Sequence, residues 1–185
     1  MLVGASQFAN WSTYATDLAG AVNLGNIAVG GTTTLYWGKS RKLIEREMPT
    51  TIIMGCGTND IIDLHRTGEG AAIGGDDYDY CMVSLMEMFH EVVPDAKIYW
   101  LTGSIYGETN RWNKREEILE CNRLLREYCA DKDWVELIEC EYMFYDDDDY
   151  TQKPNPDYFV SDYLHLSAKG YKVMTKVIRE ALGLD

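Results

Sequence analysis

The sequence predicts an α/β protein in which helices cover both faces of a parallel β-sheet, a three-layer α/β/α sandwich. Short β-rich segments alternate along the 185 residues with longer segments of helical periodicity, and this alternation is typical of right-handed βαβ units. Residues 51–54 form a continuous run rich in β-branched side chains, which fits a strand buried on both faces. No repeat or linker divides the chain, so we expect residues 1–185 to form one domain.

Five short strands are predicted, and three of them end at glycine-containing segments. Because ligands of open α/β sheets bind at the carboxyl ends of the strands, the residues that follow each strand are candidates for a functional site. The expected strands cover residues 2–3, 26–29, 51–54, 97–101 and 134–138.

Five helices are predicted from apolar residues that recur at helical spacing. Pro49 closes the second helix, Pro94 closes the third, and Ser167 is a suitable N-cap for the last. The expected helices cover residues 8–18, 35–47, 78–93, 116–128 and 167–182.

The charge balance argues against several classes of partner. Seventeen Lys and Arg residues oppose thirty Asp and Glu residues, a net charge of -13, and such a field repels nucleic acid and anionic membrane surfaces. No run approaches the ~18 apolar residues of a membrane span. No secretion signal is visible, which favours the cytoplasm, with a removed signal as the open alternative. The sequence leaves the oligomeric state undetermined.

The five cysteines fit neither a disulfide framework nor a zinc site, because their number is odd and no Cys-x-x-Cys pair is present. We expect reduced thiols. Four consecutive aspartates at residues 146–149 could offer oxygen ligands to a cation. They lack the spacing of a calcium loop, so a solvated acidic loop is the favoured interpretation.

Ser6 is a candidate nucleophile because it follows a predicted strand and precedes a predicted helix. This location exposes the hydroxyl at the sheet edge, close to the N–H groups of a helix N-terminus. A serine hydroxyl attacks only when a neighbouring base takes its proton. The alternative is a simple helix cap, since Gly4-Ala5-Ser6 lacks the second glycine of a Gly-x-Ser-x-Gly elbow.

Among the three histidines, His165 is the candidate base. Asp162 lies three residues upstream in a predicted turn, from which a carboxylate can reach the ring Nδ1, fix the tautomer and stabilise the imidazolium. The alternative is that Asp162 only begins a turn. His65 and His90 are isolated, and we interpret them as surface or helix-face residues.

Two other strand ends carry candidate donors for a developing negative charge. Asn59 follows the third predicted strand, and its neutral amide could point at an oxyanion, although such residues are also common in turns. Gly31 follows the second strand and could donate its N–H group, or only permit a positive φ.

Four sequence blocks, in this order, resemble the SGNH-type (GDSL) hydrolases. The most specific is the last, Asp-Tyr-Leu-His-Leu-Ser-Ala-Lys-Gly-Tyr, and the four blocks cover residues 2–6, 26–34, 54–60 and 162–171. The resemblance implies a flavodoxin-like, five-stranded parallel sheet and an active site with neither metal nor cofactor.

The same resemblance implies a role for each candidate. Ser6 would be the nucleophile, His165 the base and Asp162 its orienting carboxylate. The N–H groups of Ser6 and Gly31 and the side chain of Asn59 would form the oxyanion hole. The expected activity is that of a serine esterase that cleaves short acyl chains, such as acetyl groups on carbohydrates, through an acyl-enzyme.

Two positions depart from the pattern of these hydrolases. Ala5 stands where the first block usually has aspartate, and Thr32 stands where an acidic residue often follows the glycine. A binding module that kept the fold and lost activity is therefore one alternative, with Ala5 as its sign. Acyl transfer to an acceptor other than water is another, because the same acyl-enzyme can react either way. A nucleotide-binding role is disfavoured because neither Gly-x-Gly-x-x-Gly nor a Gly-x-x-x-x-Gly-Lys-Ser/Thr loop is present.

An aromatic-rich stretch precedes the His165 block and has two interpretations. Its rings could wall a substrate pocket and stack on sugars, or they could pack this loop against the body of the protein. The residues are Tyr142, Phe144, Tyr145, Tyr150, Tyr158 and Phe159.

Overall fold

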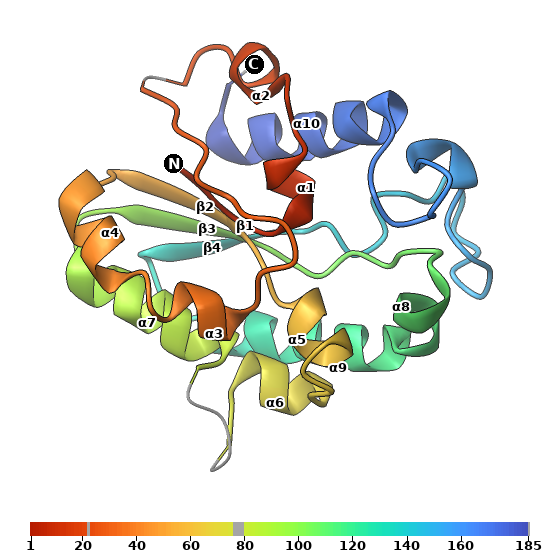
Figure 1. The fold of residues 1–185 in the computed structure, drawn as a ribbon, viewed down its shortest axis with the longest axis horizontal. Coiled ribbons are helices and arrows are strands. Elements are labelled where there is room, and N and C mark those ends of the chain that lie inside the picture. The colour runs from red at the N-terminus through yellow and green to blue at the C-terminus, as the bar shows by residue number, and fades with distance from the viewer. Residues whose placement is uncertain (22, 76–79, 185) are drawn as a thin grey trace.

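The computed structural model describes residues 1–21, 23–75 and 80–184, and it contains a parallel sheet between two layers of helices (Figure 1). The strands are hydrogen-bonded in chain order, and every neighbouring pair is parallel. They are β1 (Leu2–Gly4), β2 (Thr51–Gly55), β3 (Lys97–Leu101) and β4 (Val135–Ile138).

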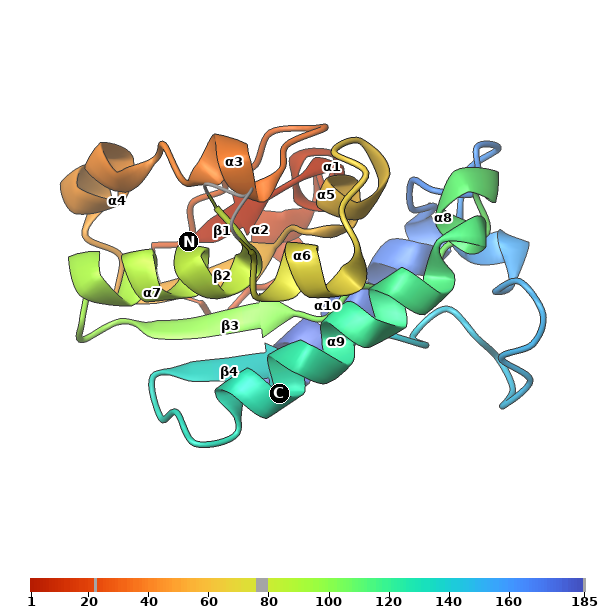
Figure 2. The same ribbon diagram turned by 90° about the horizontal axis from the view of Figure 1, so that it is seen from below.

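Helices cover both faces of this sheet, as predicted. One face carries α1 (Ser6–Ala9), α2 (Tyr14–Asp17) and α10 (Ala168–Leu182). The other carries α4 (Arg41–Glu47), α6 (Gly68–Ala72), α7 (Met82–Val92) and α9 (Arg115–Cys129). Figure 2 shows α7 and α9 in front of the sheet and α10 behind it. Short connecting helices are α3 (Thr34–Trp37), α5 (Thr58–Ile62), α8 (Thr109–Asn113) and the 3-10 turn η1 (Pro156–Tyr158).

Strand side chains alternate between two apolar cores, which fixes the two helical layers. Leu2 and Ile53 are buried in the core formed with α1 and α10. Val3 and Met54 are buried in the core formed with α7 and α9. The α/β class and the covering of both sheet faces are therefore confirmed.

The expected five-stranded sheet is not confirmed, because the segment at residues 26–29 pairs with β1 without forming a regular strand. It makes one isolated bridge, between Asn26 and Leu2, and the Ile27 N–H donates to the Leu2 carbonyl at 3.0 Å. The Asn26 side chain accepts from the Ala28 N–H at 3.0 Å and donates to the Phe8 carbonyl at 2.8 Å. These side-chain bonds compete with the ladder.

Two of the predicted helices are each divided into two short ones. The expected helix at residues 8–18 is interrupted where Trp11 and Thr13 both hydrogen-bond the Asp17 carboxylate. The expected helix at residues 35–47 is interrupted at Ser40, whose hydroxyl donates to the Trp37 carbonyl at 2.6 Å. Side-chain bonds to nearby groups again offer an alternative to continuous helix.

The last two predicted helices agree with α9 and α10 within a few residues. Ser167 is the N-cap of α10, and its hydroxyl accepts the Gly170 N–H as predicted. The third predicted helix begins at Met82 rather than 78, and residues 76–79 lie outside the described residues. All five cysteines are free. In the described segments, every helix is too short or too polar to cross a membrane.

Three helices of five residues, α5, α6 and α8, were not predicted. Such short segments lack a periodic apolar stripe that sequence patterns can detect. In α6, a side chain at Gly68 would lie 2.3 Å from the Glu117 carbonyl oxygen. Glycine there allows α6 to pack closely on α9, a contact that only the tertiary structure reveals.

Candidate active site

Asp162 and His165 form a hydrogen-bonded pair in the loop before α10. The Asp162 Oδ2 atom lies 2.6 Å from the ring Nδ1 of His165. Oδ1 accepts the N–H groups of Leu164 and His165, each at 2.9 Å. Tyr163 between them has a left-handed backbone with φ 58°, and this sharp turn folds the carboxylate back toward the ring. With Nδ1 occupied, Nε2 is the nitrogen left to act on a hydroxyl.

The surroundings of Asp162 keep its carboxyl ionised. Partial burial acts to raise the pKa, but the hydrogen bonds from the His165 ring and from the Leu164 and His165 N–H groups outweigh it and lower the pKa of Asp162. An ionised carboxylate can hold the ring in one tautomer and stabilise its protonated form. The ionised carboxylate beside Nδ1 is what the predicted base role of His165 calls for, and that role stays a prediction.

Ser6 is the first residue of α1, and only the N-cap residue Ala5 separates it from the end of β1. The adjacent Gln7 ties this segment to the His165 loop, because its side-chain amide donates to the Leu164 carbonyl at 3.1 Å. The Gln7 carbonyl also accepts the Tyr171 hydroxyl at 3.0 Å. In the described part of the chain no hydrogen bond joins the Ser6 hydroxyl to the His165 ring, so their catalytic contact stays a prediction.

The three expected oxyanion donors follow β1, β2 and the segment at residues 26–29 that pairs with β1. Asn59 in α5 is 7% exposed, and its Nδ2 donates to the Thr32 carbonyl at 3.0 Å. Gly31 has φ 74°, which glycine adopts without strain. Within the described ranges, neither the Gly31 nor the Ser6 N–H donates to a protein acceptor. Their roles in an oxyanion hole stay predictions.

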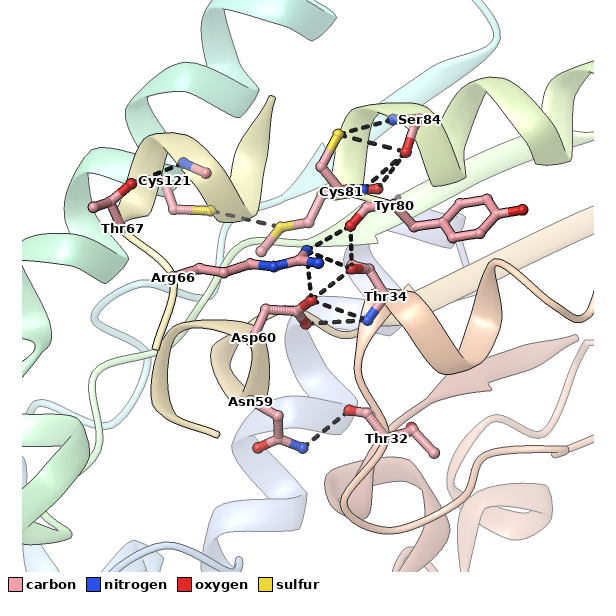
Figure 3. A network of polar contacts seen from close by, with 12 residues as sticks. Thr32, Thr34, Asn59, Asp60, Arg66, Thr67, Tyr80, Cys81, Ser84 and Cys121 are labelled. Atoms are coloured by element: carbon pink, nitrogen blue, oxygen red, sulfur yellow. Dashed lines mark hydrogen bonds and ion pairs between the residues drawn. The ribbon is translucent and has the colours of Figure 1, made fainter. Parts of the chain in front are cut away.

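A buried ion pair fixes Asn59 relative to the Gly31 segment (Figure 3). Asp60 and Arg66, 0% and 4% exposed in their side chains, are 3.1 Å apart. The Thr34 N–H and hydroxyl both donate to the Asp60 carboxylate, and Arg66 also donates to the Tyr80 carbonyl. Burial raises the pKa of Asp60, while the bonds from Thr34 and the charge of Arg66 act in the opposite direction.

We expect Asp60→Ala to lower the free energy of unfolding by roughly 3 to 5 kcal/mol, because the change breaks a buried ion pair and removes the acceptor of the buried Thr34 N–H and hydroxyl. Chemical denaturation followed by circular dichroism measures this change. Asp63→Ala is the matched control, since Asp63 is an exposed aspartate at the end of the same helix. A loss below about 1 kcal/mol for Asp60→Ala would mean that the pair is not needed for the fold.

A small cavity of about 50 Å³ lies beside Ser6, at the carboxyl ends of β1, β2 and β3. Ser6, Asn59 and Leu164, the residue before His165, all line it. Most of the surface of the cavity is apolar, and its apolar lining residues include Phe8, Leu101, Tyr106, Met143 and Met174. The structure thus brings the first, third and fourth sequence blocks to one cavity.

Arg111 also lines the cavity, and nothing in the sequence singled it out. It lies in α8, one of the unpredicted helices, and its Nη2 donates to the Asn59 Oδ1 at 2.8 Å. A lone arginine in a short polar segment carries no motif or periodicity signal. Only the packing of α8 beside α5 identifies it.

Most of the aromatic stretch packs the loop against the body of the protein. Phe144, Tyr158 and Phe159 are buried in the core with α10, whereas Tyr142 stacks on Tyr150 with ring centroids 3.9 Å apart. None of these five lines the cavity. The acidic residues 146–149 bond to neighbouring groups such as Asn155 and Tyr150, and the described residues contain no cluster of ligands that could hold a metal.

None of the three histidines lines this cavity, and the His165 loop reaches it through Leu164. His90 stacks on Trp134 at 4.3 Å, and His65 is exposed.

The two departures from the SGNH pattern change the hydrogen bonds around the start of α1 and the Gly31 segment. Ala5 is the N-cap of α1 and offers no side-chain hydrogen bond, where an aspartate could accept one. The Thr32 hydroxyl lies 3.1 Å from the Gly4 carbonyl and accepts the Trp37 ring N–H at 2.9 Å. Thr32 thus joins the Gly31 segment to the end of β1 without a charge.

Comparison with known proteins shows the family and the fold. The GDSL-like Lipase/Acylhydrolase family model matches residues 3–173, which defines the class as hydrolases that act on esters. The chain belongs to the GDSL-like lipase/acylhydrolase family. Among curated proteins, none matches the chain significantly.

Solved structures with the same fold include three esterases or lipases. A GDSL-like lipase from Bacteroides thetaiotaomicron superposes with a TM-score of 0.70 at 17% identity, over 99% of this chain and 86% of the other. A family 3 carbohydrate esterase from Clostridium thermocellum gives 0.72 at 14%, over 100% and 94%. A mutant acetyl-xylooligosaccharide esterase from Geobacillus Stearmophilus gives 0.69 at 15%, over 100% and 93%. At these identities the likeness concerns the fold.

Proposed function

We propose that this protein is a serine esterase that cleaves short acyl esters through an acyl-enzyme, with Ser6 as nucleophile. The observation that carries the proposal is the Asp162–His165 hydrogen bond in a loop that Gln7, the neighbour of Ser6, holds in place. Membership of the ester-hydrolase family supports the same chemistry. The oriented ring and the strand-end hydroxyl are the two parts that nucleophilic acyl transfer needs.

In the proposed reaction, the Ser6 hydroxyl oxygen bonds to the ester carbonyl carbon while its proton passes to Nε2 of His165. The negative charge on the carbonyl oxygen is stabilised by the Ser6 and Gly31 N–H groups and by the Asn59 amide. The carbon–oxygen bond to the alcohol then breaks, and the alcohol leaves with the proton from His165. Water repeats the sequence on the acyl-enzyme and releases the acid.

The cavity favours a short acyl chain. One water needs roughly 10 to 15 Å³ on the same measure, so a volume of about 50 Å³ accommodates a group of a few heavy atoms, such as acetyl. Its apolar lining suits the methyl group. Acetylated carbohydrates are the proposed natural class, and the similar folds of the Clostridium and Geobacillus carbohydrate esterases support this choice.

We expect kcat/KM for p-nitrophenyl acetate to exceed that for the octanoate by at least about 100-fold, because one extra methylene in a tight pocket alone costs about 10- to 200-fold. Steady-state assays across acetate, butyrate and octanoate measure this. Met143→Ala, which enlarges the cavity, should move the preference toward butyrate, whereas Met48→Ala, at a residue 62% exposed, should not. Equal rates on acetate and octanoate would contradict the short-chain assignment.

A further inference from the structure

Arg111 contacts the candidate oxyanion donor directly. Its Nη2 donates to the Asn59 Oδ1 at 2.8 Å. The Arg111 side chain is 12% exposed, and both residues line the cavity beside Ser6. A hydrogen bond from a charged guanidinium is stronger than one between neutral groups, so this contact holds the amide firmly.

The contacts of Asn59 decide which way its amide faces. A primary amide has two N–H donors and one carbonyl acceptor. Arg111 binds the carbonyl, and the Thr32 carbonyl accepts one N–H at 3.0 Å. One N–H remains for a ligand. If the amide turned over, its NH2 group would face the guanidinium, donor against donor, and that orientation is disfavoured.

Arg111 is itself held in place by α8. The Glu108 side chain accepts the Arg111 backbone N–H at 3.0 Å and lies 3.3 Å from the Arg111 Nη1. The Glu108 N–H donates to the Tyr163 carbonyl at 2.9 Å, in the turn between Asp162 and His165. Helix α8 therefore connects the Asn59 amide to the loop that carries the His165 ring.

We propose that Arg111 is a positioning residue, which keeps the free N–H of Asn59 directed at the oxyanion and polarises the amide. This inference rests on the esterase function proposed above. The guanidinium acts through its hydrogen bond to the Asn59 Oδ1. Because an oxyanion exists only in the transition state, the contribution of Arg111 should appear in kcat and not in KM.

A double-mutant cycle with Asn59 tests the proposal. Removing one oxyanion donor costs about 100- to 1,000-fold in kcat, so we expect that loss for Asn59→Ala. We expect Arg111→Met to lower kcat on p-nitrophenyl acetate by about 10- to 100-fold, which is smaller than the loss for Asn59→Ala because the amide itself remains. KM should change less than about threefold. In the Asn59→Ala background, Arg111→Met should change kcat less than about threefold, because residues that act as a unit are not additive.

Two further variants serve as controls. Arg115→Met removes an arginine that stacks on Trp112 instead of contacting Asn59, and it should leave kcat unchanged. Arg111→Lys keeps the charge and should retain more activity than Arg111→Met; it also provides a test if the methionine variant does not fold. Circular dichroism melts establish that each variant is folded.

The outcomes separate this inference from the proposed function. An unchanged kcat in both folded Arg111 variants, a loss confined to KM, or additive effects in the cycle would overturn the positioning role while the esterase stands. A wild-type protein without Ser6-dependent turnover would overturn both. A kcat loss that disappears in the Asn59→Ala background supports the inference.

Discussion

Replacing Ser6 or His165 by alanine is expected to abolish ester hydrolysis while leaving the protein folded. In a developed triad, loss of the nucleophile or of the base costs on the order of a millionfold in kcat, because neither group can act without the other. Both residues are partly exposed, so neither substitution removes a fully buried side chain. Hydrolysis of p-nitrophenyl acetate and labelling by a fluorophosphonate measure the effect.

Two surface residues provide matched controls for these variants. Ser12 is exposed shortly after Ser6, and His65 is an exposed histidine outside the cavity. Ser12→Ala and His65→Ala should keep wild-type rates and labelling. Wild-type rates in Ser6→Ala or His165→Ala would remove the assignment, and a wild-type protein that neither turns over nor labels would instead support a binding module on this fold.

Asp162→Asn is expected to lower kcat by about 10³- to 10⁴-fold, since an amide in place of the orienting carboxylate favours the wrong tautomer of the base. The asparagine oxygen can still accept the Leu164 and His165 N–H groups that Asp162 Oδ1 now accepts at 2.9 Å. The turn should therefore persist, and the loss should reflect the state of the ring.

The thermal melt of Asp162→Asn distinguishes a change in the state of the His165 ring from unfolding of the protein. The melting temperature should stay near that of the wild type, because the side chain is 45% exposed and such surface pairs contribute little to stability. Asp157→Asn is the control, at an exposed aspartate 3.4 Å from Lys169. Activity within about tenfold of the wild type would show that Asp162 does not orient the base.

Local sequence signals determined much of the fold. The buried run at residues 51–54 predicted β2, and apolar residues at helical spacing predicted α9 and α10, because burial of one face requires that spacing. Ser167 was a predictable cap, since its hydroxyl satisfies an N–H of its own helix. The Asp162–His165 contact was predictable for the same reason: the two residues are three apart in one turn.

Side-chain hydrogen bonds to nearby groups changed what periodicity alone predicted. Asn26 interrupts the expected second strand at residues 26–29, and Ser40 interrupts the expected helix at residues 35–47. Whether such a side chain bonds to the backbone or points to solvent depends on its neighbours in space. The apolar pattern is the same in both cases, so the sequence could not decide between them.

By itself the sequence determined the α/β class, the order of the strand-end blocks and the local Asp162–His165 pair, because each depends on neighbours along the chain. Only the tertiary structure decided that Arg111 holds Asn59, 52 residues away, and that Gln7 holds Leu164, 157 residues away. Contacts of this kind arise from the packing of α8 and of the last loop onto the sheet edge. No local propensity encodes them.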